Sequence, residues 1–253
     1  MAPEIDSIRA NDEHNYAVSV SVLGSDLEMV EDTHALYVLF STLLDLSPTD
    51  ASSEGVLAHR IALTFFGACR YQFSMSVLSV MRGRCTDGMI YLRRAIELCG
   101  FGALVQRHPH KAVVWLNSAD SDEAYRTYQD KFDNKALFPE REPLLKALYQ
   151  RYDLCSKAMH SSIIAISQHV RFVNGEARYS YGDIDEVDDG RLVSAFDYLI
   201  DTHHDIQRVF AGAFQKGLAE RIDAWETPFR AIELKQSGYR VKRRPTVESL
   251  LRR

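Results

Sequence analysis

Long uninterrupted apolar runs are missing from this sequence of 253 residues. A transmembrane helix needs about 20 consecutive apolar residues, so we expect no membrane span. The opening residues, Met-Ala-Pro-Glu-Ile-Asp, also lack the basic and apolar regions of a secretory signal peptide. Together these absences favour a protein of the cytoplasm.

Several sequence patterns that carry chemistry are absent as well. The chain has no glycine-rich loop for a phosphate, no Gly-x-Ser-x-Gly segment and no Cys-x-x-Cys pair, which disfavours ATP hydrolysis, serine hydrolysis and zinc-finger roles. Its four cysteines are far apart, and each falls in a helical pattern, so we interpret them as small buried hydrophobic residues. They are Cys69, Cys85, Cys99 and Cys155. We therefore expect no cofactor and no bound metal ion.

An excess of positive charge is also missing. The formal net charge is −5, and the isoelectric point near 6.0 argues against a protein coated in nucleic acid. The hydrophobic fraction of 46% and the charged fraction of 26% are typical of a globular protein. Positive charge concentrates only after residue 235. We expect one helical domain over residues 1–235, which includes a loose arm over 1–14, followed by a basic C-terminal tail over 236–253.

Helical periodicity dominates what remains and predicts an all-α bundle. Its centre is residues 57–105, read as a long antiparallel helix pair joined at Arg82-Gly83-Arg84. The second helix of that pair is apolar on nearly every face, which is typical of the middle of a bundle. Further helices are predicted over 26–46, 109–116, 121–132, 144–166, 191–216 and 219–234. Residues 170–181, with Asn-Gly at their centre, predict a small β-hairpin insertion.

Charges on the central helix require an explanation, because an unpaired buried charge is costly. Arg93 and Glu97 lie four residues apart, close enough to pair. On the helix predicted over 144–166, Tyr152, Ser156 and His160 also follow one another at four-residue steps, on one side. If the two helices pack together, His160 could act as a general base and Arg93 could stabilise negative charge. The alternative is a buried hydrogen-bonded network that fixes the packing of the helices.

A resemblance to a known group of proteins rests on these same two segments. Residues 92–97 resemble the Leu-Arg-x-x-x-Glu helix of an uncharacterised bacterial all-helical family with HEPN-like features, and residues 152–162 resemble its Tyr-x-x-x-Ser-x-x-x-His-x-Ser helix. The resemblance covers about residues 55–215. It implies a dimeric helical bundle that cuts RNA without a metal ion, as a toxin or an antiviral-defence effector.

The HEPN signature itself is an arginine followed, after four to six residues, by a histidine. Carried over to this chain, the histidine is His160, but positions 153–155 hold aspartate, leucine and cysteine instead of arginine. Arg151 or Arg93 would have to substitute for it in space. From the resemblance we expect a homodimer with RNA or a partner protein as its target. The alternative is a non-catalytic helical protein-interaction module.

Two further patterns have metal-binding parallels. His203-His204-Asp205 resembles the His-Asp pair of metal-dependent phosphohydrolases, a third possible function, which would also need His169 and Asp223. Because short motifs of this kind often occur by chance, we expect a solvent-facing cluster there. Glu31 and His34 have the spacing of a di-iron helix but lack a second such pair, so we interpret them as surface residues.

Overall fold

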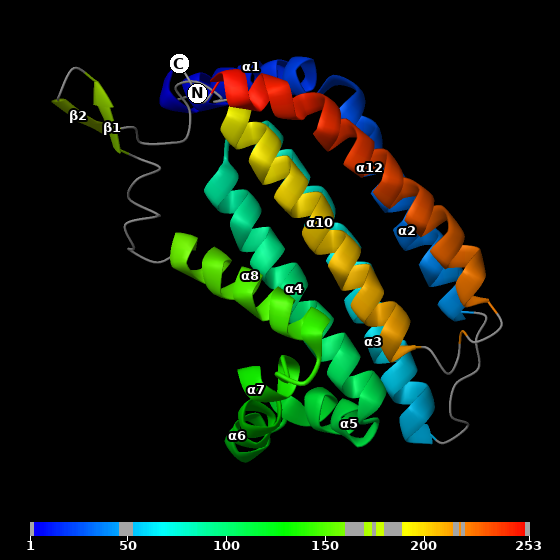
Figure 1. Ribbon diagram of the computed structural model, residues 1–253. Coiled ribbons are helices and arrows are strands. Elements are labelled where there is room, and N and C mark those ends of the chain that lie inside the picture. The colour runs from blue at the N-terminus through cyan, green and yellow to red at the C-terminus, as the bar shows by residue number, and fades with distance from the viewer. Residues whose placement is uncertain are drawn as a thin grey trace.

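The structure, a computed structural model, describes residues 3–45, 53–159, 170–173, 176–179, 189–214, 218 and 221–250. This part of the chain is predominantly helical, which confirms the all-α prediction (Figure 1). The α-helices are α1 (Pro3–Leu23), α2 (Glu28–Asp45), α3 (Ser53–Met81), α4 (Cys85–Arg107), α5 (His110–Leu116), α6 (Asp122–Lys131), α7 (Asn134–Leu137), α8 (Pro143–Met159), α10 (Asp189–Ala213) and α12 (Ile222–Leu250). Short 3₁₀ turns span Gly24–Leu27 and Asn117–Ala119.

Helices α3 and α4 pack along each other at the centre of the bundle (Figure 1). Gly83 makes the sharp reversal between them, with a φ of 77° that side chains with a Cβ rarely adopt. Helices α8 and α10 then cover α4, while α2 packs against α3 and α12 against α2. Helix α4 is therefore enclosed on several sides, which explains why its sequence is apolar almost all round.

Aromatic rings fill the core between α2, α3 and α10. The ring of Phe66 on α3 lies 4.9 Å from that of Tyr37, 5.0 Å from that of Phe40 and 4.9 Å from that of Phe210, measured between ring centroids. All four side chains are almost completely buried. Burying one large apolar side chain contributes about 1.5–3 kcal/mol, so this cluster is a principal source of stability.

Helix α12 continues through the segment that the sequence predicts to be a basic tail, as far as Leu250. Two of its basic residues meet acidic side chains on neighbouring helices. The Lys235 ammonium lies 2.9 Å from a carboxylate oxygen of Glu28 and 2.7 Å from one of Asp32, both on α2. Arg240 contacts Asp201 on α10 at 2.7 Å. Helix α12 therefore runs past residue 234, where the sequence predicts the last helix to end.

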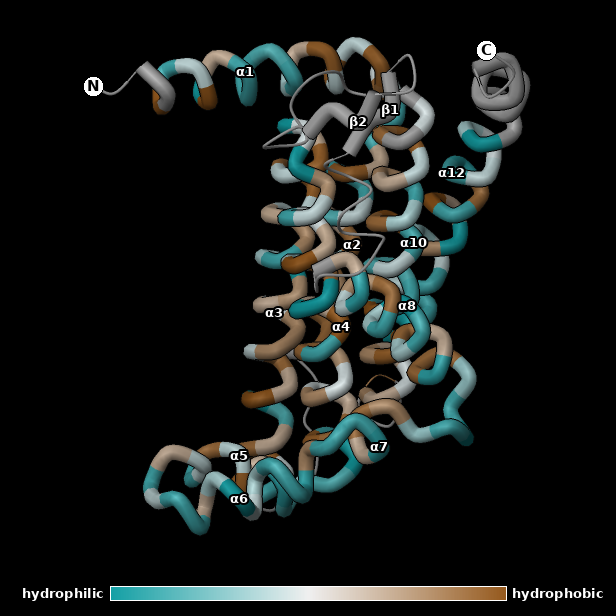
Figure 2. The backbone as a smooth tube through the Cα atoms, turned by 90° about the vertical axis from the view of Figure 1, so that its left-hand side faces the viewer, coloured by the Kyte–Doolittle hydropathy of each residue, from teal (hydrophilic) through white to brown (hydrophobic). Residues whose placement is uncertain are grey.

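The prediction of a loose arm over residues 1–14 is also wrong, because residues 3–14 form the first turns of α1. This helix crosses one end of the bundle (Figure 2). Three hydrogen bonds attach it to the reversal after α3. Arg84 donates to the two carboxylate oxygens of Asp12 at 3.0 and 2.7 Å. Asn15, which is buried, donates to the carbonyl of Arg82 at 3.3 Å. Polar anchoring of this kind has no hydrophobic periodicity, so the sequence pattern does not reveal it.

Helices α5, α6 and α7 close the opposite end of the bundle (Figure 1). Ser121 accepts a hydrogen bond from the backbone of Ala124, and Asp133 accepts one from that of Ala136, so α6 and α7 each begin with a side-chain cap.

Between α8 and α10, strand β1 (Val170–Val173) pairs with β2 (Glu176–Tyr179) in antiparallel register. No helix in the described part of the chain combines the length and the apolar character needed to cross a membrane.

Candidate functional site

Arg93 connects the central helix α4 to α8. Its Nε donates to the hydroxyl of Ser156 at 2.9 Å, and its Nη2 donates to the hydroxyl of Tyr152 at 2.6 Å. The guanidinium carbon also lies 4.6 Å from the centroid of the Tyr152 ring. Ser156 in turn donates to the backbone carbonyl of Tyr152, one turn earlier in α8, at 2.8 Å. The four-residue spacing on α8 thus presents both hydroxyls to one guanidinium.

An aromatic surface continues from this cluster along α8. The rings of Tyr149 and Tyr152 are nearly parallel, at 15°, with centroids 6.1 Å apart. Phe138, which lies just before α8, contacts both rings. Tyr149 is 39% exposed, so one large aromatic side chain beside the Arg93 cluster remains open to solvent.

Glu97 does not pair with Arg93, although the sequence predicts an ion pair between these two residues, which lie four positions apart. It forms an ion pair with Arg94, at 2.6 Å, on the more exposed side of α4. The hydroxyls of α8 draw the Arg93 side chain to the helix interface and leave Arg94 as the nearest cation to Glu97. Arg93 and Arg94 therefore both have partners, but of these two only Arg93 makes its contacts between helices.

The structure thus brings together Arg93, Tyr152 and Ser156 from the predicted site, and it turns Glu97 toward Arg94. His160 lies outside the described residues, directly after the end of α8. Cys155, beside the cluster, is buried, and burial raises the pKa of its thiol to about 12 although Arg93 and Arg151 oppose the rise. That thiol is protonated at neutral pH and unsuited to act as a nucleophile.

A second polar cluster, which the sequence analysis missed, joins α8 to α10. Arg151 donates to the hydroxyl of Thr202 at 2.8 Å and forms an ion pair with Asp205 at 2.9 Å. Asp205 also pairs with Arg208, at 3.0 Å, and Arg208 reaches Glu233 on α12. Burial raises the pKa of Asp205, while the two arginines oppose the rise. The only signal for this cluster in the sequence is that Arg151 and Asp205 lie on the apolar sides of two predicted helices.

His203, His204 and Asp205 are buried, so the prediction of a solvent-facing cluster is wrong. Helix α10 is covered by α2, α3, α4, α8 and α12, which leaves these positions little access to solvent. Nδ1 of His203 shares a hydrogen bond of 2.8 Å with the hydroxyl of Tyr37. Nε2 of His204 lies 3.2 Å from the hydroxyl of Thr33, which already donates its proton to the carbonyl of Met29, so His204 is the donor.

Burial keeps both imidazoles neutral. It lowers the pKa of His203 to about 3 and that of His204 to about 4, and nearby His204 lowers the pKa of His203 further. Nε2 of His203 has no hydrogen-bond partner among the described residues. Asp223, one of the two extra ligands that a phosphohydrolase site would need, is in the first turn of α12, and His169 lies outside the described residues.

The remaining candidate ligands do not converge. The described residues contain no group of three His, Cys, Asp or Glu side chains that could hold a metal ion. His34 is half-buried and contacts Arg70 and Ser74 on α3 through its two ring nitrogens. All four cysteines are free thiols. Three of them, Cys69, Cys99 and Cys155, are buried, which confirms their interpretation as small core residues.

The contact between α4 and α8 is the only place where the predicted site residues meet in the described part of the chain. It offers an arginine, two hydroxyls and an exposed aromatic ring, a combination suited to binding a ligand that carries both an anionic group and an aromatic ring. No family model, no curated protein and no solved structure matches this chain.

Proposed function

We propose that the protein is a HEPN-like effector that binds and cleaves single-stranded RNA at the contact between α4 and α8. In this proposal Arg93 binds a backbone phosphate, Tyr149 stacks on a base and His160 acts as the general base. One observation carries the proposal: Arg93 is fixed by two hydroxyls but pairs with no carboxylate among the described residues. Every other arginine on α4 has an acidic partner, Glu97 for Arg94 and Glu142 for Arg107.

The donors of Arg93 explain why a phosphate would suit this position. A guanidinium carries five N–H groups, and Ser156 and Tyr152 use two of them. The remaining donors keep the planar fork that binds phosphate oxygens in pairs. Because the two hydroxyls already hold the side chain in place, binding would cost little of its conformational entropy.

Stacking supplies the second part of the recognition. Single-stranded RNA is held by phosphate contacts together with aromatic side chains that stack on unpaired bases, at about 1–3 kcal/mol per base. Tyr149 is exposed, and it is held parallel to Tyr152, whose hydroxyl accepts a hydrogen bond from Arg93. A phosphate on Arg93 and a base on Tyr149 would therefore be neighbouring parts of one strand.

In the proposed reaction His160 removes the proton of a ribose 2′-hydroxyl, O2′ attacks the adjacent phosphorus, and the bond from phosphorus to the 5′ oxygen breaks. The leaving 5′ oxygen takes a proton from water, and His160 returns its own proton to solvent. Arg93 stabilises the extra negative charge on the phosphoryl oxygens. The products are a 2′,3′-cyclic phosphate and a 5′-hydroxyl end, and no step needs a metal ion.

We further propose that two copies act together as a homodimer, which a mass measurement in solution tests.

The test is cleavage of single-stranded RNA by purified protein in the presence of EDTA. Changing His160→Ala should lower the cleavage rate by about 100-fold or more, since general-base catalysis contributes about 10²–10⁴. His14→Ala removes an exposed histidine from α1 and is the matched control, which should cleave normally. Equal cleavage by both variants, or cleavage by neither wild type nor variants, contradicts the ribonuclease proposal.

A second candidate is a non-catalytic interaction module, in which the same contacts serve only to lock α8 onto α4. The observation that favours it is that Arg93, Tyr152 and Ser156 bridge two packed helices. In that case the Arg93→Gln change would lower the melting temperature, and neither the wild-type protein nor the variant would bind RNA. The two candidates therefore differ in a direct binding measurement.

A further inference from the structure

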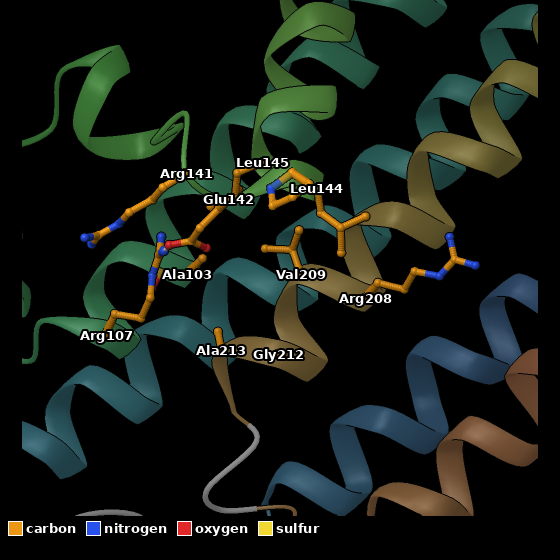
Figure 3. Close-up of a pocket in the computed structure, with 11 residues that line it drawn as sticks. Ala103, Arg107, Arg141, Glu142, Leu144, Leu145, Arg208, Val209, Gly212 and Ala213 are labelled. Carbon is orange, nitrogen blue, oxygen red and sulfur yellow. The ribbon is translucent and has the colours of Figure 1, made fainter.

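A cavity of about 270 Å³ opens where the end of α4, the beginning of α8 and the last turns of α10 meet (Figure 3). Its position is distinct from the Arg93 cluster, because Arg93 and Arg107 are separated by about 21 Å along α4 at 1.5 Å per residue. The walls combine apolar side chains with arginines. The lining residues are Ala103, Arg107, Arg141, Glu142, Pro143, Leu144, Leu145, Arg208, Val209, Gly212 and Ala213.

One side of the cavity is apolar. Leu145 and Val209 are buried and form part of the wall, and Leu144 faces Val209 across the opening (Figure 3). A Cβ atom added at Gly212 would meet no atom of the described residues within 4 Å, so the backbone of α10 is not covered by a described side chain at this position. This wall suits a short hydrocarbon group, because binding there would remove its methylene groups from water.

The other side carries an incompletely satisfied arginine. The guanidinium of Arg107 pairs with Glu142 through Nη1 and donates to the carbonyl of Ala103 through Nε at 3.0 Å. Its Nη2 is buried and has no hydrogen-bond partner among the described residues. A buried donor without a partner is destabilising, and a ligand oxygen would satisfy it.

Arg141 adds a second cation. It forms no hydrogen bond or ion pair with the described residues, and Figure 3 shows it beside Glu142 and Arg107. Burial lowers the pKa of Arg107, and the positive charge of Arg141 lowers it further, so an anion near both guanidinium groups would be favoured by their charges. Helix α8 begins at Pro143 with no acid in its first turn, so the positive end of its dipole lies at the same wall.

Arg208 lines the cavity but does not contribute a free cation. Its guanidinium is engaged by Asp205 and Glu233, and it points away from the cavity toward α12 (Figure 3). The local charge is therefore that of Arg107 and Arg141, two positive charges, against one negative charge on Glu142. The net charge of +1 matches a monoanion better than a phosphate dianion.

We propose that this cavity binds a small monocarboxylate with an apolar body. The carboxylate accepts hydrogen bonds from the free edge of Arg107 and from Arg141, while the hydrocarbon group lies against Val209, Leu144 and the bare backbone at Gly212. The site is independent of RNA cleavage, because none of its residues belongs to the contact between Arg93 and α8.

Isothermal titration calorimetry with hexanoate tests this proposal, with inorganic phosphate as the comparison anion. Hexanoate should bind the wild-type protein at least about 10-fold more tightly than phosphate, since only hexanoate buries methylene groups. Arg141→Gln should weaken hexanoate binding by about 10-fold, the loss of one charge-assisted hydrogen bond of about 1.5 kcal/mol. Gly212→Leu should abolish binding by filling the cavity.

Gly67→Leu is the matched control, because Gly67 on α3 is also a helical glycine with nothing within 4 Å of an added Cβ but does not line the cavity. It should bind hexanoate within about twofold of wild type. The proposal is overturned if hexanoate fails to bind at about 10 mM, if phosphate binds as tightly, or if Gly212→Leu binds normally while melting like the control. Thermal melting of each variant separates loss of binding from loss of folding.

Discussion

His203 and His204 are adjacent imidazoles enclosed by the bundle, and the free energy of unfolding should reflect their protonation. Their folded-state pKa values are about 3 and about 4, whereas a histidine in an unfolded chain titrates near 6.5. On acidification the unfolded chain therefore binds protons before the folded protein does. Stability is complete above pH 6.5 and decreases as the pH falls from there toward 4.

Acid should therefore destabilise the protein through both histidines. At pH 5 each histidine should cost about 2 kcal/mol of folding free energy relative to pH 7.5. His203→Gln removes one titrating group, so urea unfolding measured from pH 7.5 to 4.5 should show a pH slope smaller by up to about 1.4 kcal/mol per pH unit. The exposed His14→Gln is the control. Identical slopes for His203→Gln and wild type would contradict the neutral, buried state of this imidazole.

Of the contacts predicted for Tyr152, Ser156 and Glu97, the sequence was sufficient for the first two and not for the third. The four-residue spacing of Tyr152 and Ser156 correctly placed both on one side of α8, because helix geometry alone fixes that relation. The partner of Glu97 was not predictable, since Arg93 and Arg94 lie at comparable distances along the helix. Only the hydroxyls of a second helix decide between them, and sequence spacing carries no information about such contacts.

At the scale of elements, the position of α4 depends on Gly102, which has no Cβ atom. A Cβ at Gly102 would lie 2.5 Å from Cε1 of the Phe210 ring on α10 and 3.4 Å from Cβ of Phe65 on α3. Phe210 is fully buried, so its ring has little room to move. The close approach of three helices depends on this absent methyl group, although glycine is otherwise a weak helix former.

Gly102→Ala should therefore destabilise the protein by about 1–3 kcal/mol, the usual cost of overpacking a core. The same change at Gly67, which is exposed and has no neighbour within 4 Å of an added Cβ, should stabilise it by up to about 1 kcal/mol through helix propensity. Urea denaturation of both variants measures the difference. Stabilisation by Gly102→Ala would show that α4 does not pack as closely as the structure indicates.

The elements that sequence reasoning missed are those attached to the bundle by polar contacts. The beginning of α1 and the end of α12 lack a clean apolar stripe, so they resembled an arm and a tail. Asp12 with Arg84 anchors the first, and Lys235 and Arg240 anchor the second. The apolar helices α3 and α4 were located to within a few residues, because burial on several faces leaves a strong signal in the sequence.

At the scale of the whole molecule, α4 connects two polar regions through an apolar centre. Near its beginning, Arg93 meets the hydroxyls of α8, and at its end Arg107 faces the cavity between α8 and α10. Between them the helix is packed against α3 and α10. Ligands at the two proposed sites would therefore contact the same helix through different side chains.

RNA affinity of two neighbouring arginine variants is the most direct test of the proposed function. Arg93→Gln and Arg94→Gln remove the same charge from consecutive positions of α4, but only Arg93 lies at the contact with α8. Fluorescence anisotropy with a labelled single-stranded RNA should show binding by wild type and Arg94→Gln within about threefold of each other, and binding at least about 10-fold weaker by Arg93→Gln. Equal RNA affinity for the two variants, or no RNA binding by the wild-type protein, would contradict the account.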